Sequence, residues 1–432
     1  MITAEAWKNK KYAVYGLARS GLATVRALVA SGAEVTAWDR SEEARAKAEG
    51  ATLLDLDSAD LSAFDSLVVS PGVPLNTHPI AARARAAGVE SIGDIELFAR
   101  ARPELPPHKV VGITGTNGKS TTTALVHHIL QTAGVPTTMG GNIGLPILAQ
   151  DALPAGGVYV LELSSYQIDL TQSLDCDVAV LLNITPDHLD RYESFEAYAE
   201  SKLRLFSMQS PCRFVIVDND TDAAFGATDE QRDIEIIFTD MIEDFGAQIS
   251  MNAQSEWPTL QGPHNRLNAA AAIGVSYALE VPAADIELGL RTYPGLPHRM
   301  ERVREMGGVL FVNDSKATNA EAAAPALAAY PRIRWIVGGQ AKTKELGDTA
   351  RHLDHVVHAY TIGEAGPMFA DLLEARGIAV TRAETLENAV KCAAEDSQAG
   401  ETVLLSPACA SFDQFRDFEA RGDAFRALVG KL

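Results

Sequence analysis

The stretch GITGTNGKSTTT, residues 112–123, restricts the possible folds more than any other part of the sequence. It follows an apolar run and ends in Lys119, Ser120 and Thr121, which open a predicted helix. A strict phosphate loop, G-x-x-x-x-G-K-[ST], would have glycine where this chain has Ile113. Backbone N–H groups and a lysine at a positive helix end still suit a phosphate, whereas the alternative is a glycine turn with a surface lysine. The strand, the loop and the hydroxyl pair together favour a phosphate site in an α/β fold.

Length and composition describe a globular protein. The 432 residues are enough for two or three domains, and the hydrophobic (47%) and charged (22%) fractions are those of a folded, soluble chain. No apolar run reaches the roughly 18 residues of a membrane span, and the beginning MITAEAWKNKKYAVYG contains no apolar signal core. We therefore expect a cytoplasmic protein without membrane insertion.

The charge and the cysteines exclude further classes. A formal net charge of −20 argues against a general binder of nucleic acid or acidic membranes, because phosphate backbones require broad positive surfaces. Cys176, Cys212, Cys392 and Cys409 form no C-x-x-C pair, so neither a disulfide framework nor a zinc knuckle is indicated. A local arrangement of groups must hold any anionic ligand.

Strands and helices alternate in three parts of the chain. KYAVYG, LARSGLATVRALVASG and AEVTAWD predict a first βαβ unit, the proline-containing ARPELPPHK predicts a linker, and TYPGLPHRM predicts a second boundary. Alternation of this kind predicts mostly parallel sheets with ligands at the carboxyl ends of the strands. We expect an α/β protein with a Rossmann-like domain (1–97), a central P-loop ATPase-like domain (98–295) and a C-terminal Rossmann-like domain (296–432).

The glycine turn of the first unit, GLARSG, departs from the dinucleotide fingerprint G-x-G-x-x-G. Ala18 stands where the middle glycine would let the backbone approach a pyrophosphate. The turn therefore indicates a dinucleotide site only weakly.

The central part offers acids beside the phosphate loop. VYVLELSS places Glu162 among apolar residues at a strand end, where an unpaired carboxylate would be costly. LLNITPDHLDRY places Asp187 and His188 after another strand. A lone histidine is more often structural than a ligand, but its place beside a lysine and a glutamate favours a role in the site. Ser120 or Thr121 is expected to hold Mg²⁺ against nucleotide phosphates.

In ESFEAYAESKLRLF, Lys202 falls on the apolar stripe of a predicted helix with Tyr198 and Leu205. Such a lysine usually extends its ammonium to water. The alternative is functional, because desolvation lowers the pKa of a lysine and makes its amine nucleophilic.

A series of motifs over essentially the whole chain resembles the Mur ligases, ATP-dependent amide-forming enzymes of peptidoglycan precursor synthesis. In order, they are TGTNGKST, GGNIGLP, LELSSYQ, NITPDHLDRY, ESKLRLF, GPHNRLNAAAA, LPHRME, NDSKATN and LSPACASFDQF. Within the family, NDSKATN and LSPACASFDQFRDFEARG resemble the members that add D-glutamate, and the D-N-P-R stretch of the diaminopimelate-adding members is absent.

The resemblance implies a reaction and its cofactors. ATP would phosphorylate the carboxylate of UDP-N-acetylmuramoyl-L-alanine, and the amine of D-glutamate would then displace phosphate from the acyl phosphate. Two Mg²⁺ ions and a carbamylated Lys202 are implied as well. We expect a monomer that acts on these small molecules.

The resemblance also assigns site residues. Lys119, Glu162, His188 and Lys202 would be catalytic, and Ser120, Thr121, Glu162, His188 and the Lys202 carbamate would hold metal. ATP would be bound by Gly115, Thr116, Asn117, Gly118, Lys119, Ser120, Thr121, Asn265, Asn268, Arg299 and Asp314. Asn265 has the alternative of capping the following helix.

For the UDP substrate, the implied contacts are Gly16, Leu17, Ala18, Arg19, Ser20, Asp39, Ser41, Ser70, Pro71, Gly72, Asn142 and His188. For D-glutamate, they are Lys316, Thr318, Lys342, Ser411 and Phe418, and Phe418 has core packing as its alternative. The degraded fingerprint of the first domain is then a uridine diphosphate site.

Three other functions remain to be compared. An oxidoreductase rests on the first βαβ unit alone, and Ala18 counts against it. A P-loop switch would hydrolyse ATP without an acceptor. The folate polyglutamate-forming ligases share the TGTNGK core, but the N-terminal part and NDSKATN disfavour them.

Overall fold

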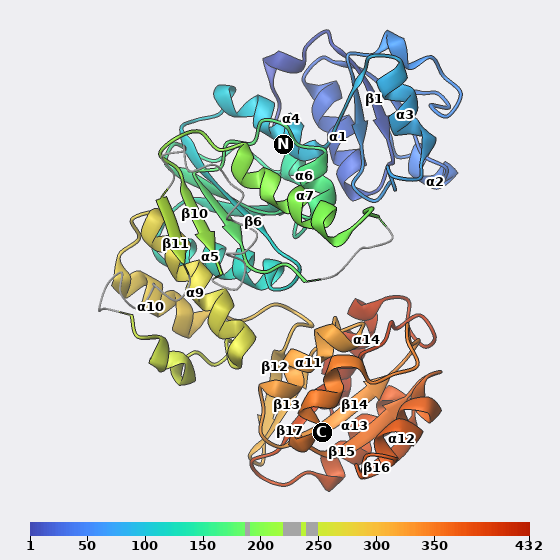
Figure 1. Ribbon diagram of the computed structural model, residues 1–432, viewed down its shortest axis with the longest axis vertical. Helices are drawn as coiled ribbons and strands as arrows, with labels where there is room; N and C mark the ends of the chain where they lie inside the picture. Colours follow the sequence, from blue (N-terminus) through green and yellow to red (C-terminus); the bar gives the residue numbers. More distant parts are fainter. Residues whose placement is uncertain (186–190, 219–234, 239–248) are drawn as a thin grey trace. The chain divides into compact units, whose positions relative to one another are not determined.

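The described part of the chain forms three β-sheets, and helices cover them (Figure 1). The computed structural model describes residues 1–185, 191–218, 235–238 and 249–432. The chain divides into two compact units, Met1–Ser250 with Asn268–Gly289 and Met251–Leu267 with Leu290–Leu432. Within the described ranges, no helix has both the length and the apolar character needed to cross a membrane.

The first sheet is parallel, with strand order β3-β2-β1-β4-β5. Its strands are β1 (Lys11–Tyr15), β2 (Glu34–Trp38), β3 (Thr52–Leu53), β4 (Ser66–Val69) and β5 (Glu90–Ile92). The associated helices are η1 (Glu5–Trp7), α1 (Arg19–Ala30), α2 (Glu42–Arg45), η2 (Leu61–Ala63), α3 (Pro79–Ala86), α4 (Asp94–Ala101) and η3 (Arg102–Glu104).

Alternate residues of β1 face opposite sides of this sheet, as the period of a strand requires. Tyr12 and Val14 join the apolar cluster that contains α1, whereas Ala13 and Tyr15 join the cluster on the α3 side. Because β1 and β4 are neighbours and the chain order reverses between them, their carboxyl ends form the crevice in which such sheets bind ligands.

The second sheet is also parallel, with strand order β11-β10-β9-β6-β8-β7. Its strands are β6 (His108–Thr114), β7 (Thr137–Gly141), β8 (Gly157–Glu162), β9 (Val178–Leu181), β10 (Phe214–Val217) and β11 (Glu235–Phe238). The described helices of this part are α5 (Lys119–Thr132), η4 (Ile147–Ala149), α6 (Ser165–Asp169), α7 (Phe195–Ser207), η7 (Met251–Glu256), α9 (Pro263–Ala278) and α10 (Ala283–Thr292).

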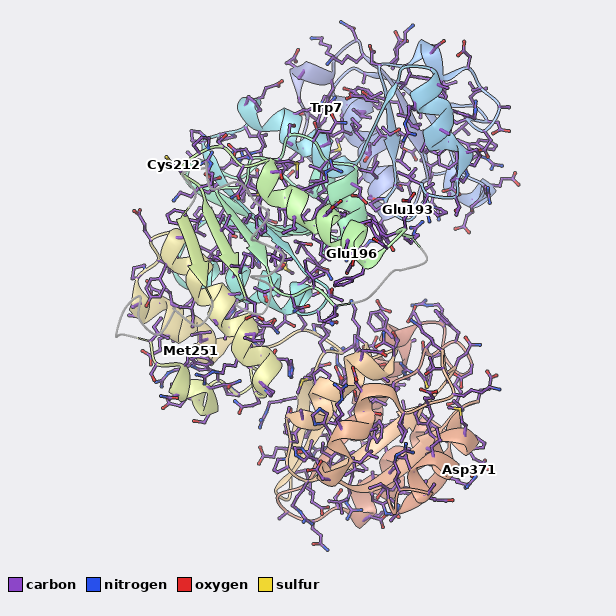
Figure 2. The ribbon with its side chains drawn as sticks, in the orientation of Figure 1. Trp7, Glu193, Glu196, Cys212, Met251 and Asp371 are labelled. Atoms are coloured by element: carbon purple, nitrogen blue, oxygen red, sulfur yellow. The ribbon has the colours of Figure 1, made fainter. Side chains whose placement is uncertain are left out.

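One apolar cluster runs from the first sheet into the second. Phe98 on α4 is fully buried, and its ring meets Tyr159 of β8 edge-on with 5.0 Å between centroids. Trp7 belongs to the same cluster and is 1% exposed, in contrast to the surface residue Asp371 of the other unit (Figure 2). The shared core explains why two sheets form one compact unit.

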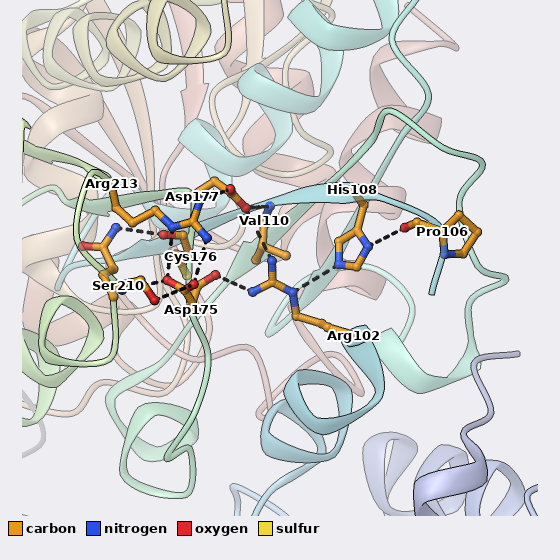
Figure 3. A network of polar contacts seen from close by, with 10 residues as sticks. Arg102, Pro106, His108, Val110, Asp175, Cys176, Asp177, Ser210 and Arg213 are labelled. Atoms are coloured by element: carbon orange, nitrogen blue, oxygen red, sulfur yellow. Dashed lines mark hydrogen bonds and ion pairs between the residues drawn. The ribbon is translucent and has the colours of Figure 1, made fainter. Parts of the chain in front are cut away.

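A polar network fixes the segment after α4 to the amino ends of the central strands (Figure 3). Arg102 donates from Nε to His108 Nε2 (3.1 Å), from Nη2 to Asp177 Oδ2 (3.4 Å) and from Nη1 to the carbonyl of Asp175. Arg213 donates to the carboxylates of Asp177 (2.6 Å) and Asp175 (2.8 Å). The predicted linker is therefore an ordered turn at the end of the sheet opposite the phosphate loop.

The third sheet has strand order β12-β13-β17-β14-β15-β16 and is parallel except for the β12–β13 pair. Its strands are β12 (Glu301–Met306), β13 (Val309–Asn313), β14 (Ile333–Gly338), β15 (Val356–Ile362), β16 (Val380–Glu384) and β17 (Thr402–Leu405). Its helices are α11 (Ala320–Ala328), η8 (Gly347–His355), α12 (Gly366–Glu374), α13 (Leu386–Asp396) and α14 (Phe418–Val429). Apolar clusters cover both faces of the sheet. This architecture confirms the predicted α/β class.

Candidate active site

The phosphate loop joins β6 to α5, as the sequence predicted. Ile113 is fully buried inside β6, where it pairs with Glu162 of β8, so the position that lacks glycine belongs to the strand and not to the turn. Gly115 (φ 148°) and Gly118 (φ 87°) adopt the backbone conformations that favour glycine. A Cβ at Gly118 would lie 2.3 Å from Asn268 Oδ1. The turn therefore needs glycine at position 118 and does not need it at 113.

No side chain caps α5 or α1 at its N-terminus. Helices α2, α6 and α7 differ, because Ser41, Ser164 and Ser194 each accept a backbone N–H there. Uncapped N–H groups at a positive helix end can donate to phosphate oxygens. The two helices that sequence patterns associated with phosphates thus have suitable ends.

Two lysines converge on the loop. Lys119 Nζ donates to the carbonyls of Gly115 (2.9 Å) and Thr116 (2.8 Å), and Lys202 Nζ also donates to Gly115 O (2.9 Å). Lys202 is 1% exposed, and its Nζ lies 4.6 Å from the ring centroid of Tyr198. The alternative in which Lys202 extends to water is therefore wrong for this structure. The side chains of Lys119 and Lys202 thus both donate to the same backbone oxygen of the loop.

Glu162 ends β8 beside the loop. Its Oε1 accepts a hydrogen bond from Asn142 Nδ2 (2.9 Å), and the residue is 2% exposed. Its Oε2 is buried without a hydrogen-bond partner among the described residues. A buried carboxylate oxygen without a donor is costly unless a cation approaches it.

The structure describes some of the other residues that were predicted to bind ATP. Asn268 is 5% exposed and receives a hydrogen bond from Thr122 Oγ1 (3.3 Å). Asn265 lies inside α9 and donates from Nδ2 to Gln261 O (3.0 Å), so it is not the N-cap of that helix. His188 and Asp187 lie outside the described residues.

In the first sheet, three predicted segments interlock. Gly16 (φ 90°) accepts a hydrogen bond at its carbonyl from Ser70 Oγ (2.7 Å). The carboxylate of Asp39 accepts two backbone hydrogen bonds, from Leu17 N–H at Oδ2 (2.7 Å) and from Ser41 N–H at Oδ1 (2.8 Å). Asp39 therefore fixes the glycine turn to the loop after β2, a role that its predicted substrate contact did not anticipate. Pro71 and Gly72 continue the Ser70 loop, and Ser20 and Arg19 begin α1.

The residues assigned to D-glutamate lie in the second unit. Lys316 Nζ lies 5.0 Å from the ring centroid of Phe418, and Ser411 is 2% exposed. Phe418 is partly exposed and belongs to neither apolar cluster of the third sheet, which disfavours its core alternative. Lys342 is exposed on the loop after β14, and Thr318 precedes α11.

Asp314 and Arg421 hold the loops around these residues. The carboxylate of Asp314 accepts hydrogen bonds from Ser406 Oγ (2.7 Å) and from the backbone N–H of Met300 (3.1 Å). Burial raises the pKa of this carboxyl group to about 7. Arg421 is 1% exposed and donates to Ser315 Oγ (3.0 Å) and Ser315 O (2.9 Å). Sequence reasoning missed Arg421, and the only available signal was its charge within the FEARG segment.

Parallel sheets, a glycine turn, a lysine and a buried acid at strand ends define a P-loop-type nucleotide-binding protein. Family models extend the description over the chain: the Mur ligase MurD-like N-terminal domain matches residues 10–93, the Mur ligase middle domain 113–276 and the Mur ligase glutamate ligase domain 298–409. The chain belongs to the Mur ligase family, which confirms the resemblance predicted from its motifs.

Curated relatives match over the full length. The UDP-N-acetylmuramoylalanine--D-glutamate ligase of Novosphingobium aromaticivorans is 59% identical over 443 aligned positions, covering 100% of this chain and 97% of the relative. The enzyme of the same name from Sphingopyxis alaskensis is 57% identical, with 100% of both chains covered. The solved MurF ligase of Thermotoga maritima in complex with ADP has the same fold, with a TM-score of 0.60, 16% identity and 99% and 97% of the two chains covered.

Proposed function

We propose that this chain joins D-glutamate to UDP-N-acetylmuramoyl-L-alanine and uses ATP, which becomes ADP and phosphate. The observation that carries the proposal is the 59% identity, over the whole chain, to a relative named UDP-N-acetylmuramoylalanine--D-glutamate ligase. The phosphate loop and the buried acid beside it support ATP as the energy source. The product is a precursor of peptidoglycan.

The chemistry needs activation because a carboxylate is a poor acyl donor. An oxygen of the L-alanyl carboxylate attacks the γ-phosphorus, and the bond from that phosphorus to the β-phosphate oxygen breaks. The amine nitrogen of D-glutamate then attacks the acyl carbon and forms the C–N bond of the amide. The bond between the acyl carbon and the phosphate oxygen breaks, phosphate leaves, and the nitrogen loses a proton. Since two anions must meet in the first step, positive charge from Lys119 and from the α5 N-terminus lowers the barrier.

The residues present fit Mg²⁺. Glu162 has a buried carboxylate oxygen with no hydrogen-bond donor in the described part of the chain, and a hard cation prefers such an oxygen. Ser120 or Thr121, at the start of α5, and Glu162 would hold one ion. His188 and a modified Lys202 would hold a second one. The metal supplies charge neutralisation at the phosphate oxygens.

We infer that Lys202 carries a carbamate, which would place an anion beside the Lys119 ammonium at Gly115. The Lys202 ammonium first loses a proton, and the neutral amine then adds to CO₂, forming an N–C bond and releasing a second proton, so that a cation becomes an anion with two oxygens. Its 1% exposure disfavours the ammonium form, and Lys119 at the same carbonyl disfavours it further. We infer that the modified side chain is a metal ligand that also faces Lys119.

The remaining roles follow the motifs. We infer that Gly115 to Thr121, Asn265, Asn268, Arg299 and Asp314 bind ATP, that the Gly16, Asp39, Ser70 and Asn142 segments bind the UDP substrate, and that Lys316, Thr318, Lys342, Ser411 and Phe418 bind D-glutamate. The proximity of Lys316 and Phe418 supports the last group. The proposal also includes a monomeric state and a cytoplasmic location. It divides the chain into domains 1–97, 98–295 and 296–432. The three separate sheets support the division.

Phosphate release tests the function. The purified protein receives ATP, Mg²⁺, UDP-N-acetylmuramoyl-L-alanine and one amino acid from a panel of D- and L-forms. Release should require the UDP substrate and be fastest with D-glutamate. Equal release without an acceptor would identify an ATPase, and a preference for D-alanine or diaminopimelate would identify another ligase. Light scattering of the same sample tests the monomer.

A further inference from the structure

Residues 182–185, which follow β9, lie against the phosphate loop. The N–H of Thr116 donates to Asn183 O (2.8 Å), which continues the parallel pairing of β6 with β9 past the ends of both strands. Gly115 permits this approach, because a Cβ there would lie only 3.3 Å from backbone atoms of Asn183. The two segments therefore meet backbone to backbone.

The side chain of Asn183 adds a second connection between these segments. Its Oδ1 accepts a hydrogen bond from the N–H of Asn117 (2.8 Å), and its Nδ2 donates to the carbonyl of the same residue (3.1 Å). The two bonds fix the orientation of the amide, since a flipped amide would place donor against donor and acceptor against acceptor. One side chain therefore pairs with both backbone polar groups of Asn117.

Thr116 makes the reverse connection. Its Oγ1 accepts a hydrogen bond from the N–H of Thr185 (3.0 Å) and donates to the carbonyl of Thr185 (3.2 Å). A side chain from each segment thus pairs with the backbone of the other, and we call these four residues, Thr116, Asn117, Asn183 and Thr185, the reciprocal clamp. Without its bonds, the turn would have to be ordered when a ligand binds, at an entropic cost.

The reciprocal clamp divides the phosphate loop into two halves. The N–H groups of Thr116 and Asn117 both donate to Asn183 (2.8 Å each), so they are occupied within the chain. The uncapped N-terminus of α5, which begins at Lys119, is the part of the loop that suits phosphate oxygens. The first half of the loop therefore holds the second half in place.

We propose that Asn183 is a positioning residue for ATP, which acts on the nucleotide phosphates through the backbone of Asn117. The inference rests on the proposed function, since it assumes an adenine nucleotide at this loop. A residue that only ended β9 and supported the fold would behave differently. Its substitution would lower the free energy of unfolding and weaken every ligand alike, whereas loss of a positioning residue weakens the nucleotide selectively.

Calorimetric titration of the full-length protein with ADP and Mg²⁺ tests the proposal, with UDP-N-acetylmuramoyl-L-alanine titrated in parallel. Asn183→Ala should weaken ADP about tenfold and leave the UDP substrate within about twofold, because the cost of ordering the turn then opposes nucleotide binding. Asn183→Asp keeps an acceptor for the N–H of Asn117 but turns its second oxygen toward the Asn117 carbonyl, so it should weaken ADP at least as much. Gln131→Ala removes an exposed amide from the far end of α5 and is the matched control.

A second pair of variants tests the other half of the reciprocal clamp. Thr116→Val removes the hydroxyl that bonds to Thr185 and should also weaken ADP about tenfold. Thr116→Ser keeps the hydroxyl and should weaken ADP less than Thr116→Val does. Urea unfolding of each variant measures whether the fold is retained, so a variant that unfolds is not mistaken for one that has lost the nucleotide.

The outcomes separate this proposal from the function itself. Equal weakening of ADP and of the UDP substrate by Asn183→Ala would overturn the positioning role, and so would an Asn183→Asp protein that binds ADP as the wild type does. Unchanged ADP affinity in Asn183→Ala and Thr116→Val would do the same. If the wild type binds ADP but adds no D-glutamate to the UDP substrate, the proposed function fails and the titrations still decide the role of Asn183. A wild type that binds no ADP overturns both proposals.

Discussion

Lys119 and Lys202 reach the carbonyl oxygen of Gly115 from two different helices, each at 2.9 Å. Their proposed roles differ: Lys119 neutralises phosphate charge, whereas Lys202 supplies oxygens after carbamylation. The difference is testable at the scale of single residues, because a small carboxylate can replace lost oxygens but cannot replace a lost cation.

Lys202→Ala should lower turnover by at least about 100-fold, which corresponds to about 2.7 kcal/mol in the barrier, and millimolar acetate should restore part of it. Lys119→Ala should lower turnover by a similar factor, and acetate should not restore it. The control is Lys109→Ala, which replaces an exposed lysine at the start of β6 and should leave turnover unchanged. Steady-state phosphate release measures all three. A fully active Lys202→Ala protein, together with density for a bare ammonium in a substrate-bound crystal, would remove Lys202 from the mechanism.

At the scale of elements, the strand-to-helix turn before α5 depends on glycine where the backbone has positive φ. Gly118 (φ 87°) would place a Cβ 2.3 Å from Asn268 Oδ1, whereas Gly134 (φ 73°), just after α5, has nothing within 4 Å of such a Cβ. Gly134→Ala should lower the free energy of unfolding by about 1 kcal/mol, which is the cost of a non-glycine residue with positive φ. Gly118→Ala should lower the free energy of unfolding by more, because the added Cβ also collides with Asn268, and it should raise the KM for ATP. Urea unfolding and ATP kinetics check this, and equal costs with unchanged KM would contradict it.

The linker network after α4 predicts a pH dependence. Burial lowers the pKa of His108, with the Pro106 carbonyl and Asp177 acting in the opposite direction and Arg102 in the same one. The unfolded histidine has a pKa of about 6.5. The folded state therefore binds its proton less readily, so this stabilisation is complete above about pH 6.5 and is lost as the pH falls through the lower folded pKa.

Replacement of this histidine should flatten the acid side of the stability profile. His108→Gln retains an acceptor for Arg102 but does not titrate, so its free energy of unfolding should fall less than that of the wild type between about pH 7.5 and pH 5.5. Urea titrations at the two pH values measure the difference. A slope identical to that of the wild type in His108→Gln would refute the assignment.

At the scale of the whole molecule, the apolar clusters predict two cooperative transitions. Phe98 lies in the cluster shared by the first two sheets, and Phe369 lies in a cluster of the third. Replacement of a buried phenylalanine by alanine costs about 3–5 kcal/mol. In calorimetry, Phe98→Ala should lower the midpoint temperature of one unfolding transition, and Phe369→Ala should lower that of the other. If both variants shift a single transition, the chain unfolds as one unit.

The sequence predicted the glycine turn between β6 and α5 and the class of fold because their signals are local. A glycine turn, a lysine and two hydroxyls within GITGTNGKSTTT need only their own segment to form a strand, a turn and a helix. The whole-length motif series placed the chain in its family for the same reason. The absence of glycine at 113 was puzzling only in the sequence, because the end of β6 cannot be located to one residue from its pattern.

What the tertiary structure decided concerns side chains from separate segments. Thr116 and Asn183 are far apart in the sequence, and only the pairing of β6 with β9 brings their loops together. Likewise, hydrophobic spacing put Lys202 on an apolar stripe, but only packing buried its amine beside Gly115. Local propensity and glycine geometry are encoded within a segment, whereas burial and hydrogen-bond partners depend on which segments meet.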